Sequence, residues 1–254
     1  IFFIFLSAST NMIILIGYFR IFEKYLNNYG KYLLIILFVI HPYMNIYFFR
    51  FYTDLFAAIG IFLILYYKLK NININLFFVI SALILMNFRI ALIPVFIVYG
   101  LWEMYSQYIR KNYKETFLSI LIVLISLLSY IPVMEFSFSF ASINSDYNLV
   151  EKIIYNIVLA LGYRESIGIS GEILILEKWT DVLSFFASLI LIAIHLIGTL
   201  GIIKFSFKQD KSILIIFTYL LLPILAIAHM RYLLPLIPIL LFGFSYIFFR
   251  NPRE

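Results

Sequence analysis

The sequence predicts an all-α protein that is built as a polytopic bundle of transmembrane helices. Of its 254 residues, 64% are hydrophobic and 13% are charged, whereas a soluble domain is about one-quarter charged. The mean hydropathy is +1.03, and the apolar residues form long runs that are separated by short polar breaks. The basic residues gather in every second break, as they do on the cytoplasmic side of membrane proteins.

The apolar runs define about nine expected spans in one transmembrane domain, residues 1–254. A membrane-spanning helix needs roughly 20 apolar residues, and fewer where flanking side chains snorkel to the interface. The expected spans are 1–19, 32–49, 53–67, 75–88, 90–106, 116–133, 183–203, 212–228 and 233–249. Because the chain opens inside an apolar run without a charged leader, we expect it to be an N-terminally truncated part of a longer protein.

The basic breaks set the expected orientation. Thirteen of the 19 Lys and Arg residues lie in five breaks, namely Arg20/Lys24/Lys31, Lys68/Lys70, Arg110/Lys111/Lys114, Lys204/Lys208/Lys211 and Arg250/Arg253. Assigning these breaks to the cytoplasm puts the start of the chain outside and its end inside. The net charge of +6 then reflects topology and membrane-lipid contact, so we expect no nucleic-acid partner. The chain has no cysteine, which excludes disulfides and thiolate metal sites.

One outer break, residues 134–182, is long and is expected to form an extracytoplasmic loop. Within it, about 148–163, apolar residues share one helical face while Glu151, Lys152 and Asn156 lie away from it. This pattern is typical of an amphipathic helix at the membrane interface. A helix packed on top of the bundle would show the same pattern, and the sequence does not separate the two.

The other outer breaks are three short corners that contain charged residues, Arg50–Asp54, Asn87–Arg89 and His229–Tyr232. The topology places all three near the same face of the bilayer. An ionisable group costs about 2.5–3.5 kcal/mol at the centre of a membrane-spanning helix on insertion scales, so charged residues that border the spans need a reason. Thr53 is a suitable N-cap, which sets the Asp54 carboxylate in the first turn of a helix. Arginine forks bind phosphate oxygens at two points. We therefore expect an outward-facing phosphate site.

Each of these residues also has a plain structural interpretation. Arg89 can snorkel to lipid headgroups, and Asp54 can serve only as a helix-start carboxylate. His41, which precedes a proline, fits a packed and hydrogen-bonded histidine. His195 lies alone in mid-span, where a structural role is favoured over a proton relay. Glu103 falls near a span end and is expected to be solvated.

Several of these segments resemble the GT-C superfamily of integral-membrane glycosyltransferases. The resemblance rests on Ser7–Ile14, His41–Pro42, Phe51–Asp54, Asn87–Arg89 and, above all, the H-x-R-Y-x-x-P-x-x-P pattern of His229–Pro238. It covers most of the chain in outline, although its motifs are short and degenerate. Members take a sugar from a polyprenyl-phosphate carrier and pass it to a glycan, lipid or protein acceptor at the outer face of the bacterial plasma membrane.

The resemblance implies a role for each corner residue. Arg50, Arg89 and Arg231 would contact the donor phosphate, with His229 and Tyr232 beside them as further substrate-binding residues. Fixed guanidinium donors would stabilise the charge that develops on the leaving phosphate. Asp54 would help to bind the acceptor or a metal ion, with a secondary chance of acting as a catalytic base. The family's usual base follows the first span and is expected to precede this chain.

Two other functions remain open at this stage. A polymerase of the O-antigen or capsule type also uses outer arginines on polyprenyl-linked sugars, but it favours a large outer loop with several arginines, and the loop here has only Arg164. A lipid-linked oligosaccharide transporter or flippase predicts ionisable residues near the midplane and inverted repeats. The sequence admits a divalent cation as cofactor, with Asp54, His41 and His229 as possible ligands, yet no two of these three residues have the spacing of a local ligand pair.

Overall fold

The computed structural model describes residues 2–41, 54–141, 179–221 and 233–252. Within these ranges the chain is helical apart from short connections, and no strand is formed. The one β-type contact there is an isolated bridge between Leu26 and Arg250, which ties the start of the chain to its end. The predicted all-α class is therefore confirmed for the described residues.

In the described ranges, every expected span coincides with one main helical segment. These segments are α1 (Phe2–Phe22), α2 (Asn28–Ile40), α4 (Asp54–Leu69), α5 (Leu76–Phe88), α6 (Ile93–Ile109), α7 (Tyr113–Ala141), α9 (Trp179–Lys208), the 3-10 helix η4 (Lys211–Leu220) and α11 (Ile237–Phe249). Two 3-10 turns join them, η1 (Glu23–Tyr25) after α1 and η2 (Ile90–Leu92) before α6.

Length and composition mark two of the described segments as capable of crossing a membrane. They are Ile90–Ile109, which joins η2 to α6, and Leu189–Lys208 in α9. Five further apolar helices in the described part are shorter, between 10 and 17 residues. Two such helices are weak evidence for a membrane, so the nine-span arrangement remains a proposal.

Local sequence signals explain where the helices start. The side chains of Asn27, Asn75 and Asp210 accept hydrogen bonds from backbone N–H groups in the first turns of α2, α5 and η4. Pro94 and Pro238 occupy the first turns of α6 and α11, where the missing N–H costs nothing. These capping residues fix the register of the short helices.

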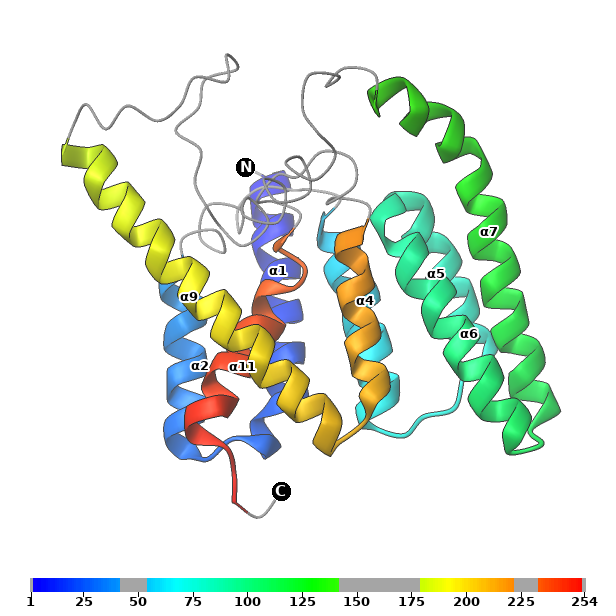
Figure 1. Cartoon of the computed structure of the whole chain (residues 1–254), viewed down its shortest axis with the longest axis horizontal. Coiled ribbons are helices and arrows are strands. Elements are labelled where there is room, and N and C mark those ends of the chain that lie inside the picture. Colours follow the sequence, from blue (N-terminus) through cyan, green and yellow to red (C-terminus); the bar gives the residue numbers. More distant parts are fainter. Residues whose placement is uncertain (1, 42–53, 142–178, 222–232, 253–254) are drawn as a thin grey trace.

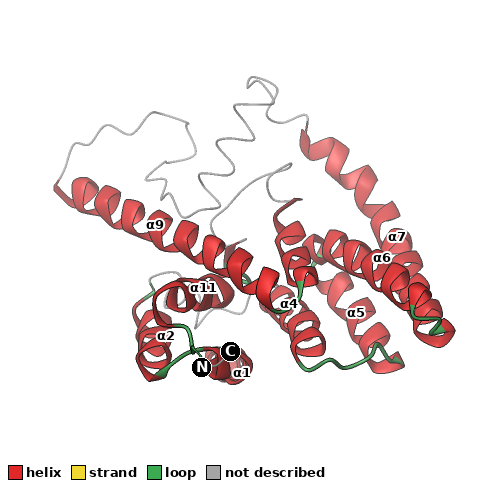
Figure 2. Cartoon of the chain, turned by 60° about the horizontal axis from the view of Figure 1, so that its bottom comes forward, coloured by secondary structure: helices red, strands yellow, loops and turns green. Residues whose placement is uncertain are grey.

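Two groups of helices make up the bundle (Figure 1, Figure 2). In one, α11 packs against α9, α2 and α1, and in the other α7 packs against α5 and α6 while α4 and η4 complete the group. Contacts of α1 with α4 and of α9 with η4 join the two groups. The α9–α11 contact is close enough for backbones to touch, because Gly198, Gly201 and Gly243 meet there without side chains.

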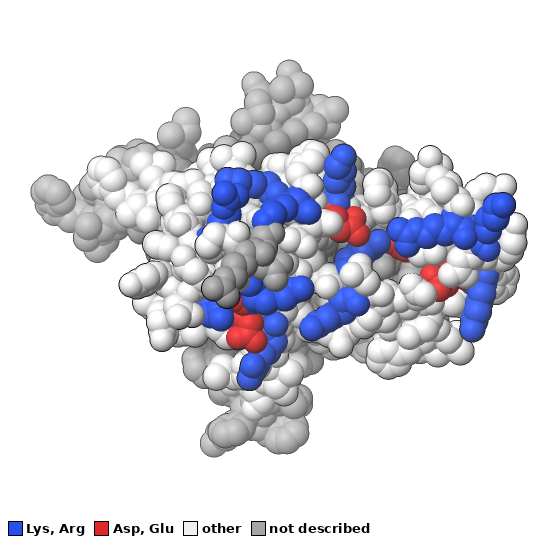
Figure 3. All heavy atoms as spheres, turned by 90° about the horizontal axis from the view of Figure 1, so that it is seen from below, with Lys and Arg blue, Asp and Glu red and all other residues white. Residues whose placement is uncertain are grey.

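The basic residues of the five predicted breaks lie at one end of the bundle, which we call the basic end. It is the lower end in Figure 1, and Figure 3 shows Lys and Arg side chains spread across it. Their described members include ten exposed side chains, Arg20, Lys24, Lys70, Arg110, Lys111, Lys114, Lys204, Lys208, Lys211 and Arg250. The predicted alternation of breaks thus corresponds to an uneven distribution of basic residues between the two ends of the bundle, within the described residues.

The structure differs from the expected element bounds in three places. Helix α2 ends at Ile40, since a residue before proline, here His41, is driven out of the helical region. The predicted loop 134–182 is helical at both margins, because α7 runs on to Ala141 and α9 begins at Trp179. The rest of that loop, with the expected interfacial helix at 148–163, lies outside the described residues.

Candidate functional site

Three of the polar residues singled out by the sequence lie at the end of the bundle opposite the basic end. We call this end the far end. His41 follows α2, Asp54 begins α4 and Arg89 follows α5. These helices contain 13, 16 and 13 residues, so each residue lies about 20–24 Å along its helix from the basic end. That distance is shorter than the roughly 30 Å hydrocarbon core of a bilayer. In a membrane, these groups would sit within its outer part.

Arg89 points into the bundle. Its backbone leaves α5 in an extended conformation, and its side chain is half-buried, with atom Nη2 shielded from solvent. Its Nε donates a long hydrogen bond of 3.5 Å to the hydroxyl of Tyr219, a fully buried residue of η4. A snorkelling arginine would extend outward. The geometry therefore disfavours the lipid-headgroup interpretation of Arg89.

The other predicted site residues are only partly placed. Asp54 is the first residue of α4, as predicted, and a carboxylate is favoured by the positive end of the helix dipole there. The orientation of its side chain is not described. Arg50, His229, Arg231 and Tyr232 lie outside the described residues, so their convergence with Arg89 stays a prediction.

Two histidines that the sequence analysis treated separately are paired. His41, which follows α2, and His195 of α9 are both buried, and their Nε2 atoms lie 3.0 Å apart. The packed, hydrogen-bonded histidine expected at position 41 is confirmed, whereas the solitary position assumed for His195 is wrong. In the sequence, each of the two residues stands out only as an ionisable group within or beside an apolar run. Because 154 positions separate them, no local spacing indicates the pair.

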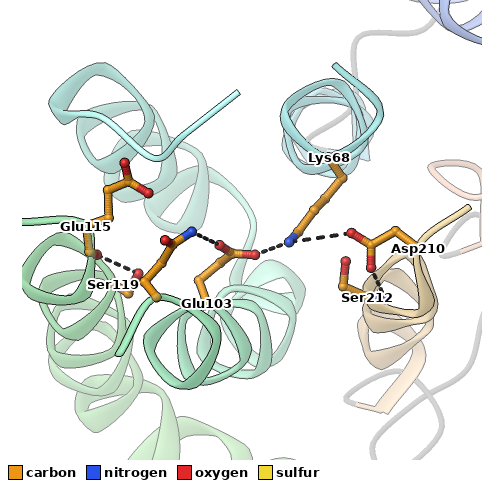
Figure 4. Close-up of polar contacts among 7 residues, drawn as sticks. Lys68, Glu103, Glu115, Ser119, Asp210 and Ser212 are labelled. Atoms are coloured by element: carbon orange, nitrogen blue, oxygen red, sulfur yellow. Dashed lines mark hydrogen bonds and ion pairs between the residues drawn. The ribbon is translucent and has the colours of Figure 1, made fainter. Parts of the chain in front are cut away.

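A second polar cluster lies at the basic end and joins α4, α6 and η4 (Figure 4). Lys68 forms ion pairs with Glu103 and with Asp210, the latter at 3.8 Å. Glu103 also accepts a hydrogen bond of 3.2 Å from Gln107, one turn further along α6. We call Lys68, Glu103, Gln107 and Asp210 the ion network. The expectation that Glu103 is solvated is wrong, because only 4% of it is exposed and Lys68 compensates its charge.

The described part of the chain offers no ready metal centre, since no group of three or more His, Asp or Glu residues gathers there in a suitable arrangement. The chemistry visible at the far end is therefore that of a cationic hydrogen-bond donor, Arg89, near a phenol and near the start of α4. Such a donor can bind an anionic oxygen. Comparison of the chain with protein-family models, with curated proteins and with solved structures gives no match.

Proposed function

We propose that the chain is an integral protein of the bacterial plasma membrane, with about nine spans and its basic end in the cytoplasm. Three features support this proposal: the apolar composition, the helical segments at all nine expected positions in the described ranges, and the gathering of basic residues at one end. Many large apolar side chains are also exposed on the helices, as lipid contact would require. The far end then faces outward.

We further propose that the protein transfers a sugar from a polyprenyl-phosphate carrier to an acceptor at that outer face. The observation that supports it most is the inward-turned guanidinium of Arg89. A charge at that depth is expensive, and the cost is understandable if the charge meets an anion that the site must bind. A carrier phosphate in the outer leaflet is such an anion.

The residues have defined parts in this reaction. The acceptor oxygen bonds to the anomeric carbon of the sugar while the bond from that carbon to the carrier phosphate breaks. Arg89 stabilises the negative charge that grows on the departing phosphate, and Arg50 and Arg231 are expected to assist. A carboxylate takes the proton of the acceptor, and Asp54 is a secondary candidate for this base.

The decisive experiment measures binding of polyprenyl phosphate to the protein in nanodiscs by native mass spectrometry. Loss of one charge-assisted contact costs about 1.5–3 kcal/mol, so Arg89→Ala should weaken binding roughly 10- to 150-fold. Arg110→Ala removes an exposed arginine at the basic end and is the matched control. Equal binding by both variants would remove Arg89 from the site. Sugar transfer is then assayed with radiolabelled polyprenyl-phosphate sugars.

One observation favours a second candidate function, that of a transporter or flippase for lipid-linked sugars. The His41–His195 pair places ionisable groups inside the bundle, which is a common feature of transport pathways. An assay in reconstituted vesicles distinguishes the two functions. A transferase joins sugar to acceptor on one side, whereas a flippase moves an intact labelled carrier between leaflets without breaking the glycosidic bond.

A further inference from the structure

The contact between His41 and His195 has the geometry of a hydrogen bond between two ring nitrogens. The Nε2 atoms lie 3.0 Å apart and the ring centroids 5.3 Å apart, with the ring planes inclined by 32°. The centroid separation exceeds the nitrogen separation by roughly the sum of the two ring radii, so the rings meet head-on. In this arrangement one nitrogen donates and the other accepts. A metal ion shared by two head-on rings would hold the nitrogens about 4 Å apart, because each metal–nitrogen bond is about 2 Å long, and the observed 3.0 Å is shorter.

Such a contact needs one proton between the two nitrogens. A pair of neutral imidazoles satisfies it, and so does one imidazolium facing one neutral ring. Two imidazolium ions do not, because each would direct an N–H group at the other at 3.0 Å inside an apolar environment. The contact therefore holds while one nitrogen stays unprotonated and breaks when both carry protons.

The described helices around the pair carry few groups that could compensate a further positive charge. Within the described residues, α2, α11 and η4 contain no carboxylate. Their titratable side chains are Tyr29, Lys31, Tyr32, Lys211, Tyr219 and Tyr246. Helix α9 itself carries Lys204 and Lys208 and one carboxylate, Asp181, which is 14 residues or about 21 Å along the helix from His195. The lysines lie at the basic end, and Lys204 is nine residues, or about 13 Å, along α9 from His195. The described neighbours would thus oppose a doubly charged pair.

We propose that His41 and His195 form a proton-binding site inside the bundle, which holds α2 against α9 through one shared proton and releases this contact when a second proton enters. The ligand is the proton itself. This site is independent of the phosphate chemistry proposed for Arg89, because it lies between other helices.

Nitrogen NMR of the full chain in nanodiscs, labelled with ¹⁵N-histidine, tests this directly. The chain has three histidines, so the ring signals are few, and each is assigned from its loss in His41→Gln or His195→Gln. On acidification, the pair should take up its protons in two steps separated by at least about one pH unit. In each single variant the remaining partner should titrate in one step. Simultaneous titration of both wild-type rings near the free-histidine value of about 6.5 would overturn the proposal.

A stability measurement provides a second, independent readout. Two free histidines bind more protons in acid than the folded pair can, so the pair's contribution to stability falls as pH falls. Between about pH 8 and about pH 5, the melting temperature of the wild type should drop more than that of His41→Phe/His195→Phe, which has nothing to protonate at this contact. Equal drops would contradict the proposal. If the double variant does not fold, the NMR titration of the wild type decides, and a stoichiometric transition metal in the purified protein would also overturn it.

Discussion

Removal of the Lys68 charge should destabilise the protein far more than removal of a surface lysine or arginine. Only 14% of the Lys68 side chain and 6% of the Glu103 side chain are exposed. Lys68→Met keeps the length of the side chain but leaves Glu103 as a buried carboxylate whose remaining described partner is the neutral Gln107. Breaking a buried ion pair in this way costs about 3–5 kcal/mol, because one charge stays uncompensated.

The matched control is Arg20→Met. Arg20 pairs with Glu23 at 3.3 Å, but 73% of its side chain and 29% of its partner's are exposed. A pair this accessible contributes at most about 1 kcal/mol. Glu103→Gln added to Lys68→Met removes the stranded charge and should recover most of the loss. The free energy of unfolding, measured by titration with SDS in mixed micelles and followed by circular dichroism, compares all four proteins. If Lys68→Met loses no more than Arg20→Met, the ion network does not stabilise the fold.

Two further predictions concern packing and capping. In Gly201→Ala, the new methyl group would overlap the carbonyl oxygen of Gly243, so α9 and α11 must separate at a cost of about 1–3 kcal/mol or more. Gly17→Ala is its control, because its methyl group meets only the edge of a phenylalanine ring at 3.0 Å and should leave the melting temperature nearly unchanged. Asn75→Ala removes the cap of α5 and should cost about 0.5–2 kcal/mol, against no loss for the exposed Asn73→Ala. If Gly201→Ala and Gly17→Ala destabilise the protein equally, the packing argument is contradicted. If Asn75→Ala and Asn73→Ala do so, the capping argument is contradicted.

Local sequence patterns were sufficient to predict the helices, because apolar runs and polar breaks are properties of neighbouring residues. The start of α5 follows from Asn75. The expected span 32–49 ran past the end of α2, although Pro42 explains why the helix ends before it. The margins of the 134–182 loop were misplaced, since hydropathy marks the apolar part of a helix and not its polar continuation. In particular, α7 and α9 extend past their apolar cores.

The polar contacts could not be predicted in the same way, because they join residues that are distant in the chain. His41 meets His195 across 154 positions, and Lys68 meets Glu103 across 35. No local spacing encodes either pair. For Glu103 the local signal was misleading, since a carboxylate near a span end is usually solvated. Only the placement of α4 against α6 and η4 shows that a lysine covers it.

The conformation of η4 links the sequence to the position of Arg89. Residues 211–220 include four β-branched residues, Ile213, Ile215, Ile216 and Thr218, which lose side-chain freedom in an α-helix. In the 3-10 form, side chains three apart share one face, and Ile213, Ile216 and Tyr219 are all buried. The same form rises about 2.0 Å per residue, against about 1.5 Å in an α-helix. Tyr219 therefore stands about 16 Å from the start of η4, near the ends of the neighbouring short helices, where its hydroxyl meets Arg89. Rewinding the segment as an α-helix would place the phenol about 4 Å nearer the basic end and turn it off this face, so the hydrogen bond between Arg89 and Tyr219 depends on how this short segment is wound.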